Sequence, residues 1–420
     1  MEATLFDARK QVGLLPEIPT GSVRAMTRTT LSQRFVRMLC CFLTLAAAAT
    51  SAAAPADQQP PNMEAIGGQL ATIFNERQVD TLSSMLDLSG LGARVAASVY
   101  DNDKGRAEFV RGFMKSAQAK TLVAEFFAQL DRAPDSAVKY MKVVRRGNES
   151  RPLLRFDYGD SGFEYLEFVV QADAKGKARI VDWAPLSGGE LYSEVIGRMA
   201  RILTEPAPGL IQNLLGMQQI DQATLKRMKA IAEMRRKGDL RGAFQEMEKL
   251  PAEIADSRVI LVQRASLASE ANDDNAYRKV LARLEKLHGN DPAAAFMLLD
   301  HYFYAKDLNK CLQAIATIES RVGVDGMTQM LRSNIYMSSG MHKEAITHAS
   351  KAIDIEPEMS DPYFTLAQSH VMLGQFGEAI EIYSTLQADF GYEFSKENFA
   401  QDATFTKFIA SSQFKKWQSQ

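Results

Sequence analysis

The sequence predicts an α+β domain followed by an all-α array of helical repeats. Three observations predict this class: a 34-residue period in the second half, a change from helical to alternating apolar spacing after residue 132, and short polar turns between the alternating segments. A fixed period of this length is typical of stacked helical hairpins. The 46% hydrophobic and 24% charged residues indicate an ordinary globular chain, and 420 residues leave room for two or three domains.

Residues 1–54 are predicted to be a leader that contains a secretory signal peptide. Arg28, Arg34 and Arg37 precede an apolar run over 38–49 and a zone of small residues. The run is too short to span a bilayer, so a membrane anchor is the weaker alternative. Met26 is a candidate true start, with a long n-region as the alternative. We therefore expect an exported bacterial protein, periplasmic or secreted, and a linker over 55–62.

The α+β domain is predicted over 63–186. Helical spacing predicts helices over 63–78, 81–88 and 104–132, and Ser89-Gly90-Leu91-Gly92 is interpreted as a break. Strand-like segments at 137–146, 153–158, 163–171 and 178–183 predict an antiparallel meander, covered on one face by the 104–132 helix. This order of elements loosely resembles the nuclear-transport-factor-2-like and cystatin-like folds.

The second half is predicted to hold a helical connector over 187–223, repeats over 224–386 and a C-terminal cap over 387–420. Five helix-joining turns fall on the period, at Gly238, Asn272, Lys306, Gly340 and Gly374. Five positions where paired helices cross fall on it too, at Ala243, Tyr277, Cys311, Ala345 and Ala379. Small residues suit a close crossing, so Tyr277 departs from the pattern. The aromatic residues beyond 387 predict short helices packed on the last repeat.

The pattern resembles the tetratricopeptide repeat. The best match begins near Ser360, with Tyr363 and Leu366 in the first helix, Gly374 in the turn, and Ala379 in the second helix. Arg332 stands where the repeat expects leucine, which predicts a rotated or shifted helix there.

The resemblance implies a concave groove lined by the first helix of each hairpin. The groove positions are Phe296, Asp300, Phe303, Tyr304, Met327, Met330, Asn334, Met337, Phe364, Gln368, Val371 and Met372. Such a surface, rich in Met and Phe, suits an apolar or amphipathic segment of a protein or peptide partner. The alternative is that a one-residue shift in register places about half of them in the core.

No catalytic, cofactor-binding or metal-binding residue is predicted. Gly159-Asp160-Ser161-Gly162 has the order of a serine-protease nucleophile segment, but the first histidine is His288, so a hairpin turn is preferred. The five histidines lack metal-ligand spacing, and Cys311 is interpreted as a small packing residue. A formal charge of -2 gives no electrostatic reason to expect nucleic acid.

These observations predict an exported, non-catalytic protein–protein interaction scaffold that uses an apolar groove and inserts no stable helix into a membrane. One alternative is a small-ligand-binding or weakly enzymatic α+β domain with the repeats as an accessory. Another is a purely structural component of the cell envelope.

Overall fold

A computed structural model describes residues 62–131, 136–159, 162–203 and 222–419. The predicted leader, nearly all of the linker and residues 204–221 of the connector lie outside these residues. The described chain forms two compact units, which meet in the sequence between Ala294 and Ala295. The predicted domain boundaries stay predictions.

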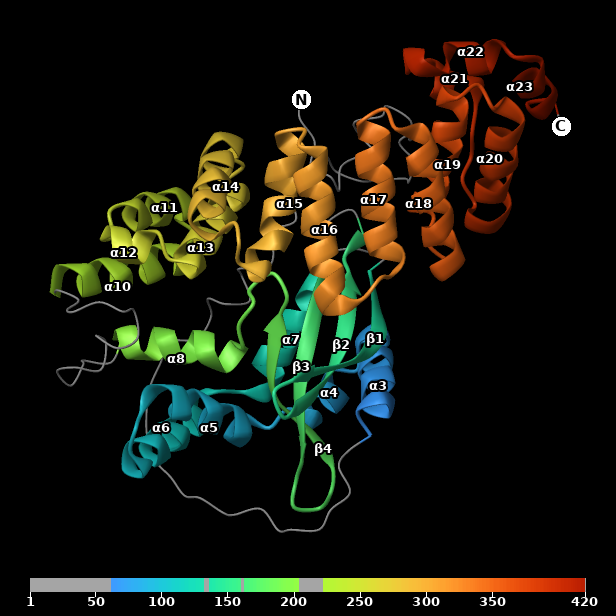
Figure 1. Cartoon of the computed structure of the whole chain (residues 1–420). Helices are drawn as coiled ribbons and strands as arrows, with labels where there is room; N and C mark the ends of the chain where they lie inside the picture. Colours follow the sequence, from blue (N-terminus) through green and yellow to red (C-terminus); the bar gives the residue numbers. More distant parts are fainter. Residues whose placement is uncertain (1–61, 132–135, 160–161, 204–221, 420) are drawn as a thin grey trace. The chain divides into compact units, whose positions relative to one another are not determined.

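A four-stranded antiparallel sheet of order β1-β2-β3-β4 organises the first unit (Figure 1). Its strands are β1 (Ala137–Arg146), β2 (Glu149–Asp157), β3 (Phe163–Ala172) and β4 (Ala178–Pro185). The predicted meander is confirmed. The second strand begins four residues earlier than predicted, because the β1–β2 ladder continues to the pair Arg146 and Glu149 at the turn.

One face of the sheet packs on α3 (Met63–Asn75) and α7 (Ala119–Leu130) around a core of aromatic rings. Phe74 is fully buried, and its ring centroid lies 4.8 Å from that of Phe156 and 5.7 Å from that of Phe126. Trp183 of β4 closes the same core against Phe126, at 5.3 Å. The sequence predicts that one face of the sheet is covered by a helix. Side chains of both α3 and α7 cover this face.

The single helix predicted over 104–132 is wrong. The chain forms α6 (Asp103–Ser116) and α7 instead, with extended backbone at Ala117. Phe113 and Leu122 are nine residues apart, so they would lie about 180° apart around one continuous helix. The break lets both side chains pack against the same core.

The break predicted at Ser89-Gly90-Leu91-Gly92 is also wrong, because these residues lie in α5 (Leu88–Val99), which follows α4 (Val79–Met85). The Asp87 carboxylate caps α5 by accepting from the Ser89 and Gly90 amides at 2.9 and 3.0 Å. A Cβ at Gly90 would lie 2.7 Å from Cγ1 of Val181. The glycine thus permits close packing on β4.

Five helical hairpins follow, two in the first unit and three in the second. Helix α8 (Tyr192–Leu203) precedes them. The hairpins are α10 (Gln222–Arg236) with α11 (Leu240–Glu248), α13 (Arg258–Glu270) with α14 (Asp274–His288), α15 (Ala295–Tyr304) with α16 (Leu308–Val322), α17 (Gly326–Ser338) with α18 (His342–Ile355), and α19 (Asp361–Met372) with α20 (Phe376–Phe390). Short helices α12 (Ala252–Ala255) and η4 (Pro292–Ala294) lie between them. The predicted α+β-then-repeat fold class is confirmed.

The five predicted turn residues all adopt left-handed backbone. Their φ values are 81° at Gly238, 54° at Asn272, 55° at Lys306, 74° at Gly340 and 75° at Gly374. Glycine takes this conformation without steric cost, whereas asparagine and above all lysine do not. The left-handed turn is therefore kept at Asn272 and Lys306, although neither residue type favours a positive φ.

The helix-crossing positions are buried in every hairpin. Ala243, Ala345 and Ala379 have no exposed surface, and Cys311 and Tyr277 are 2% and 3% exposed. The hairpin with Tyr277 therefore forms despite the larger side chain.

Arg332 is accommodated by an ion pair, and no rotated helix is needed to explain it. Its Nε and Nη2 donate to the Glu319 carboxylate of α16 at 3.1 and 2.6 Å, while Leu331 beside it is fully buried.

The segment after α20 folds into α21 (Lys396–Ala400), η5 (Ala403–Phe405), α22 (Thr406–Ala410) and α23 (Ser412–Trp417). Aromatic side chains of this segment share one core with the last hairpin, and Phe399 lies 5.0 Å from Tyr383 between ring centroids. The short helices thus pack on the last repeat as the sequence predicts. Over the described residues, no helix combines the length and apolar character that crossing a membrane requires.

Candidate functional site

The first helices of the second unit carry all of the predicted groove positions. Phe296, Asp300, Phe303 and Tyr304 come from α15, where the Asp300 side chain is buried and the three aromatic residues are half-buried. On α17, Met327, Met330 and Asn334 are buried, whereas Met337 is half-buried. On α19, Gln368 and Val371 are buried, Phe364 is half-buried, and Met372 is 44% exposed.

A hydrogen bond links one of the predicted groove residues, Asn334 of α17, to the neighbouring first helix α19. Thr365 Oγ1 of α19 donates to Asn334 Oδ1 of α17 at 2.7 Å, in a buried contact. Asn334 therefore holds one hairpin to the next. The residues with accessible surface on this set are Phe296, Phe303, Tyr304, Met337, Phe364 and Met372.

Phe364 is partly covered by the chain's own C-terminal segment. Its ring centroid lies 4.8 Å from that of Tyr392 and 6.2 Å from that of Phe394. Both residues follow α20, in the place where a further repeat would begin. The candidate surface for a partner therefore centres on α15, α17 and the exposed end of α19.

Polar side chains support these helices from the other side. His348 Nδ1 of α18 lies 2.8 Å from Gln329 Oε1, and its ring stacks on Tyr336 at 5.2 Å. Gln329 Nε2 in turn donates to Glu319 Oε1 at 3.1 Å. Burial lowers the pKa of His348, as do the nearby cations Lys351 and Arg332. This histidine is thus a neutral, hydrogen-bonded packing residue near neutral pH.

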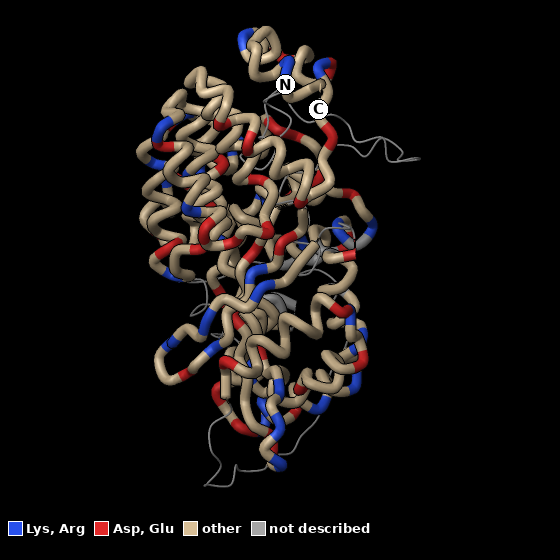
Figure 2. Tube along the Cα trace, turned by 90° about the vertical axis from the view of Figure 1, so that its right-hand side faces the viewer, with Lys and Arg blue, Asp and Glu red and all other residues tan. Residues whose placement is uncertain are grey.

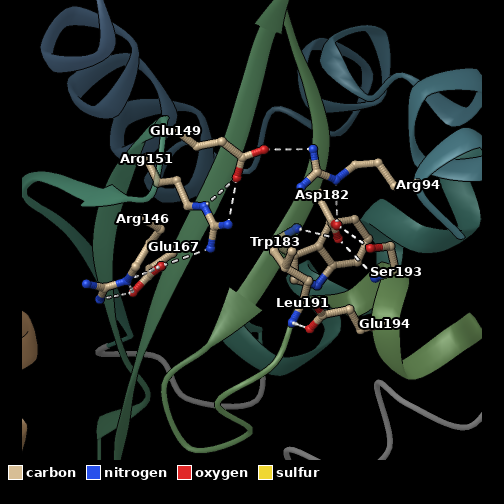
Figure 3. Close-up of polar contacts among 10 residues, drawn as sticks. All are labelled: Arg94, Arg146, Glu149, Arg151, Glu167, Asp182, Trp183, Leu191, Ser193 and Glu194. Atoms are coloured by element: carbon tan, nitrogen blue, oxygen red, sulfur yellow. Dashed lines mark hydrogen bonds and ion pairs between the residues drawn. The ribbon is translucent and has the colours of Figure 1, made fainter. Parts of the chain in front are cut away.

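A second polar group, missed by the sequence analysis, occupies the sheet face opposite the aromatic core (Figure 3). Asp182 of β4 is completely buried and accepts from Arg94 Nε at 3.0 Å and from Ser193 Oγ at 2.5 Å. Arg94 Nη1 also donates to Glu149 Oε1 at 2.9 Å. These hydrogen bonds and ion pairs of Arg94 and Asp182 thereby join α5, β2, β4 and the start of α8.

The same group continues across β2 and β3. Arg151 pairs with Glu149 at 2.6 Å and with Glu167 at 3.3 Å, and Arg146 forms a further ion pair with Glu167. Each carboxylate has a cationic partner, which lowers the pKa of Glu149 against the opposing effect of burial. Glu149, Arg151, Glu167 and Asp182 lie on the strand positions that face away from the core, and this alternation is the signal that could have found them. The network is fully paired, so it presents no free nucleophile or base.

Other candidate chemistry of the described residues is accounted for by packing. Burial raises the pKa of the Cys311 thiol to about 12, which disfavours a reactive thiolate. Gly159 and Gly162 adopt positive φ, and the Gly162 amide donates to the Gly159 carbonyl at 2.9 Å, as in a hairpin turn. Residues 160–161 between them lie outside the described set. Among the described residues, no group of three His, Cys, Asp or Glu side chains is arranged to hold a metal ion.

Residues 336–391 match the tetratricopeptide repeat family. Among solved structures, MamA (residues 41 to the end) from Desulfovibrio magneticus RS-1 is similar at 15% identity and a TM-score of 0.35, over 42% of this chain and all of that one. A crystal structure of PilW, a widely conserved type IV pilus biogenesis factor, is similar at 12% identity and a TM-score of 0.33, over 48% of this chain and 92% of that one. No curated protein sequence matches this chain.

The described hairpins from α10 to α20 are thus tetratricopeptide-like helical repeats, and the family match itself covers residues 336–391. The resemblance of the α+β domain to nuclear-transport-factor-2-like or cystatin-like folds stays a prediction.

Proposed function

We propose that the protein is an exported, non-catalytic scaffold that binds a protein or peptide partner through the first helices of its repeats. The observation that carries this proposal is the 34-residue period, kept as five left-handed turns in five hairpins. Repeats of this kind generally act as extended binding surfaces. Export is supported by the basic and apolar residues over 28–54, which lie outside the described part of the chain.

The expected partner segment is apolar or amphipathic. Phe303, Tyr304, Met337 and Met372 offer aromatic and thioether surface, which adapts to an inserted helix or apolar peptide. In the view of Figure 2, basic and acidic residues are interspersed over the described chain. A partner that depends on a continuous basic face, such as nucleic acid, is not part of this proposal.

The ligand-binding alternative for the α+β domain has less support. The covered sheet face is filled by Phe74, Phe126, Phe156, Phe168 and Trp183, whose rings pack edge to face or tilted. A tightly packed interior is unlike the concave, partly polar pocket that a small ligand requires. A purely structural role in the cell envelope remains the third proposal, and the absence of any selectable peptide would favour it.

The proposal is tested with a displayed library of amphipathic helical peptides selected on the full chain. Met372→Glu places a charge on the candidate surface and should lower the affinity of the chain for the selected peptides at least tenfold. Ile355→Glu is the matched control, because Ile355 is also apolar and 44% exposed but lies on a second helix. Equal affinity of the two variants, with both shown to be folded by circular dichroism, would reject the candidate surface.

A further inference from the structure

The loop from Leu186 to Glu190 follows β4 in the sequence and contacts α13 and η4, which all belong to the first unit. On the sheet side, the Leu186 amide donates to the Tyr165 carbonyl at 2.8 Å. The Ser187 amide and hydroxyl both donate to the Glu164 carboxylate of β3. Ser187 and Glu164 are both buried, so this end of the loop is anchored inside the domain.

The other side of the loop is bound by α13 and η4. Arg258 Nη1 donates to the Gly188 carbonyl at 2.5 Å, and its Nη2 pairs with Glu190 at 3.3 Å. Arg258 Nε also pairs with Asp291 at 3.0 Å. Gly189 has a φ of 68°, and a Cβ on it would lie 2.4 Å from that of Ala293. Each of the five residues 186–190 therefore contacts either β3 or the segment formed by α13 and η4.

Glu164 is the unusual member of this junction, because it is a buried carboxyl without a cationic partner. Glu164 is 2% exposed. Its carboxylate oxygens accept hydrogen bonds from the Ser187 amide and hydroxyl and from the Tyr165 amide, the last at 2.9 Å. No ion pair of Glu164 occurs within the described ranges. Burial raises its pKa to about 7, against the opposing effect of these hydrogen bonds.

The titratable and charged groups near Glu164 come from β2 and from the far side of the loop. Asp157 ends β2, Tyr158 follows it, and Arg155 of β2 is buried opposite Tyr165 in the strand register. Across the loop the charged groups are Glu190, Arg258 and Asp291. The pKa of Tyr158 is raised by burial and further by Glu164 and Asp157, so it remains neutral near pH 7. Arg258 is engaged by both Glu190 and Asp291.

We propose that the 186–190 loop is a proton-controlled latch, which holds α13 and η4 to the sheet while Glu164 is protonated and loosens when this carboxyl ionises. Opening of the loop would admit water to the carboxylate and so favour the charged form. Because the closed state binds the proton more tightly than the open state, a rise in pH must shift the equilibrium toward opening. The latch concerns the junction with the first hairpins and does not depend on the groove of the second unit.

The size of the effect follows from the same linkage. Between the ordinary glutamate pKa of 4.5 and the raised value of about 7, the opening constant should rise up to tenfold for each pH unit. Above pH 7 it should level off. Acidification below pH 7 therefore lowers the opening constant, and the constant reaches its highest value from about pH 7 upward.

Amide hydrogen exchange of the full chain between pH 5 and 8.5 tests this proposal. The reporters are the amides of Leu186 and Gly189, which donate to the carbonyls of Tyr165 and Pro185. After division by the intrinsic exchange rate, their protection should fall up to tenfold per unit toward pH 7. Glu164→Gln should remove this pH dependence. The Ala379 amide in the last hairpin is the internal control and should show none.

Ser187→Ala keeps the test decisive if Glu164→Gln does not fold. This variant removes a donor to the ionised carboxylate, so it should move the levelling-off point to higher pH. A flat protection profile in the wild-type chain, or the same profile in wild type and in every folded variant, would overturn the latch.

Discussion

Arg332 shows how a single residue can depart from the repeat pattern without disturbing the fold. The Arg332 and Glu319 side chains are 16% and 13% exposed, and they pair between α16 and α17 at a position where leucine is the usual residue. A pair of this kind stabilises mainly because loss of one partner leaves the other charge poorly solvated.

Glu319→Ala should therefore lower the free energy of unfolding by about 1–3 kcal/mol, because it leaves Arg332 without a carboxylate. The double variant Arg332→Leu/Glu319→Leu should recover most of this loss, since it removes both charges and restores apolar packing. Urea denaturation measures both values. Glu233→Ala, in an exposed pair with Lys237, is the control and should change stability by less than about 0.5 kcal/mol. A double variant no more stable than Glu319→Ala would contradict the account.

Cys311 should behave as a packing residue with an alkaline pH dependence. Because burial raises its pKa above the ordinary 9.0 to about 12, the folded state binds the thiol proton more tightly than the unfolded state. Its contribution to stability is thus complete below pH 9 and is lost as the pH rises toward 12. Peptide mapping after iodoacetamide treatment should show slow labelling of Cys311 at pH 8 unless the protein is unfolded. Rapid labelling of the folded chain would mean that the thiol is accessible.

At the scale of elements, each of the five hairpins turns at one left-handed residue, and three of them also begin the second helix with a side-chain cap. Asp239, Asp273 and Asp307 accept from amides at the start of α11, α14 and α16, whereas Met341 and Gln375 make no such side-chain bond. The same turn is thus built with different residues, and the differences should be measurable.

Lys306→Gly should stabilise the protein by about 1 kcal/mol, because Lys306 holds a φ of 55° that favours glycine. Gly340→Lys, at the equivalent turn of the next hairpin, should destabilise it by a similar amount. Asn272→Gly should give a smaller gain, since asparagine tolerates this conformation better. Thermal denaturation compares the three variants. Stabilisation by Gly340→Lys would contradict the assigned turn geometry.

The caps give a second comparison between hairpins. Asp307→Ala should cost about 1 kcal/mol, because it removes the acceptor of the Lys310 amide, which lies 3.1 Å away. Met341→Asp should supply the missing cap to α18 and gain up to about 1 kcal/mol. The free energy of unfolding in urea measures both changes. A loss of stability on Met341→Asp would show that the Met341 side chain has a packing role that outweighs the cap.

The periodic elements could be predicted from the sequence because their signals are local. Turn and crossing positions repeat at one spacing, and the strands alternate between short turns. The α6–α7 break was missed because it depends on Phe113 and Leu122 having to reach one core. Helix α5 was missed because Gly90 serves close packing on Val181 and Gly92 serves close packing on Phe113, which the sequence does not show. The Arg94–Asp182 network was missed because its members come from segments far apart in the chain.

At the scale of the whole molecule, the repeats need an end that closes their apolar edge. Tyr383, Leu386, Phe399, Phe405, Phe408 and Phe414 are almost completely buried in the core shared by α20 and the C-terminal helices. A segment with this many buried rings is part of the fold of the second unit.

Phe399→Ala should reduce the free energy of unfolding by about 3–5 kcal/mol, because it opens a cavity in this shared core. Phe390→Ala, at a half-buried ring of the same cluster, should cost clearly less. Denaturation followed by tryptophan fluorescence is suitable, since Trp417 contacts Phe399 at 6.4 Å between ring centroids. Equal, small losses in the two variants would show that the C-terminal helices add little to the unit.

The central claim is that the first helices of the second unit receive a polypeptide. Its most direct test is photo-crosslinking of a selected amphipathic peptide to chains that carry a photoreactive amino acid at position 337, 372 or 355. We predict crosslinks from 337 and 372, on first helices, and none from 355 at the end of α18. Crosslinks from 355 alone, or equal yields at all three positions, would contradict the claim.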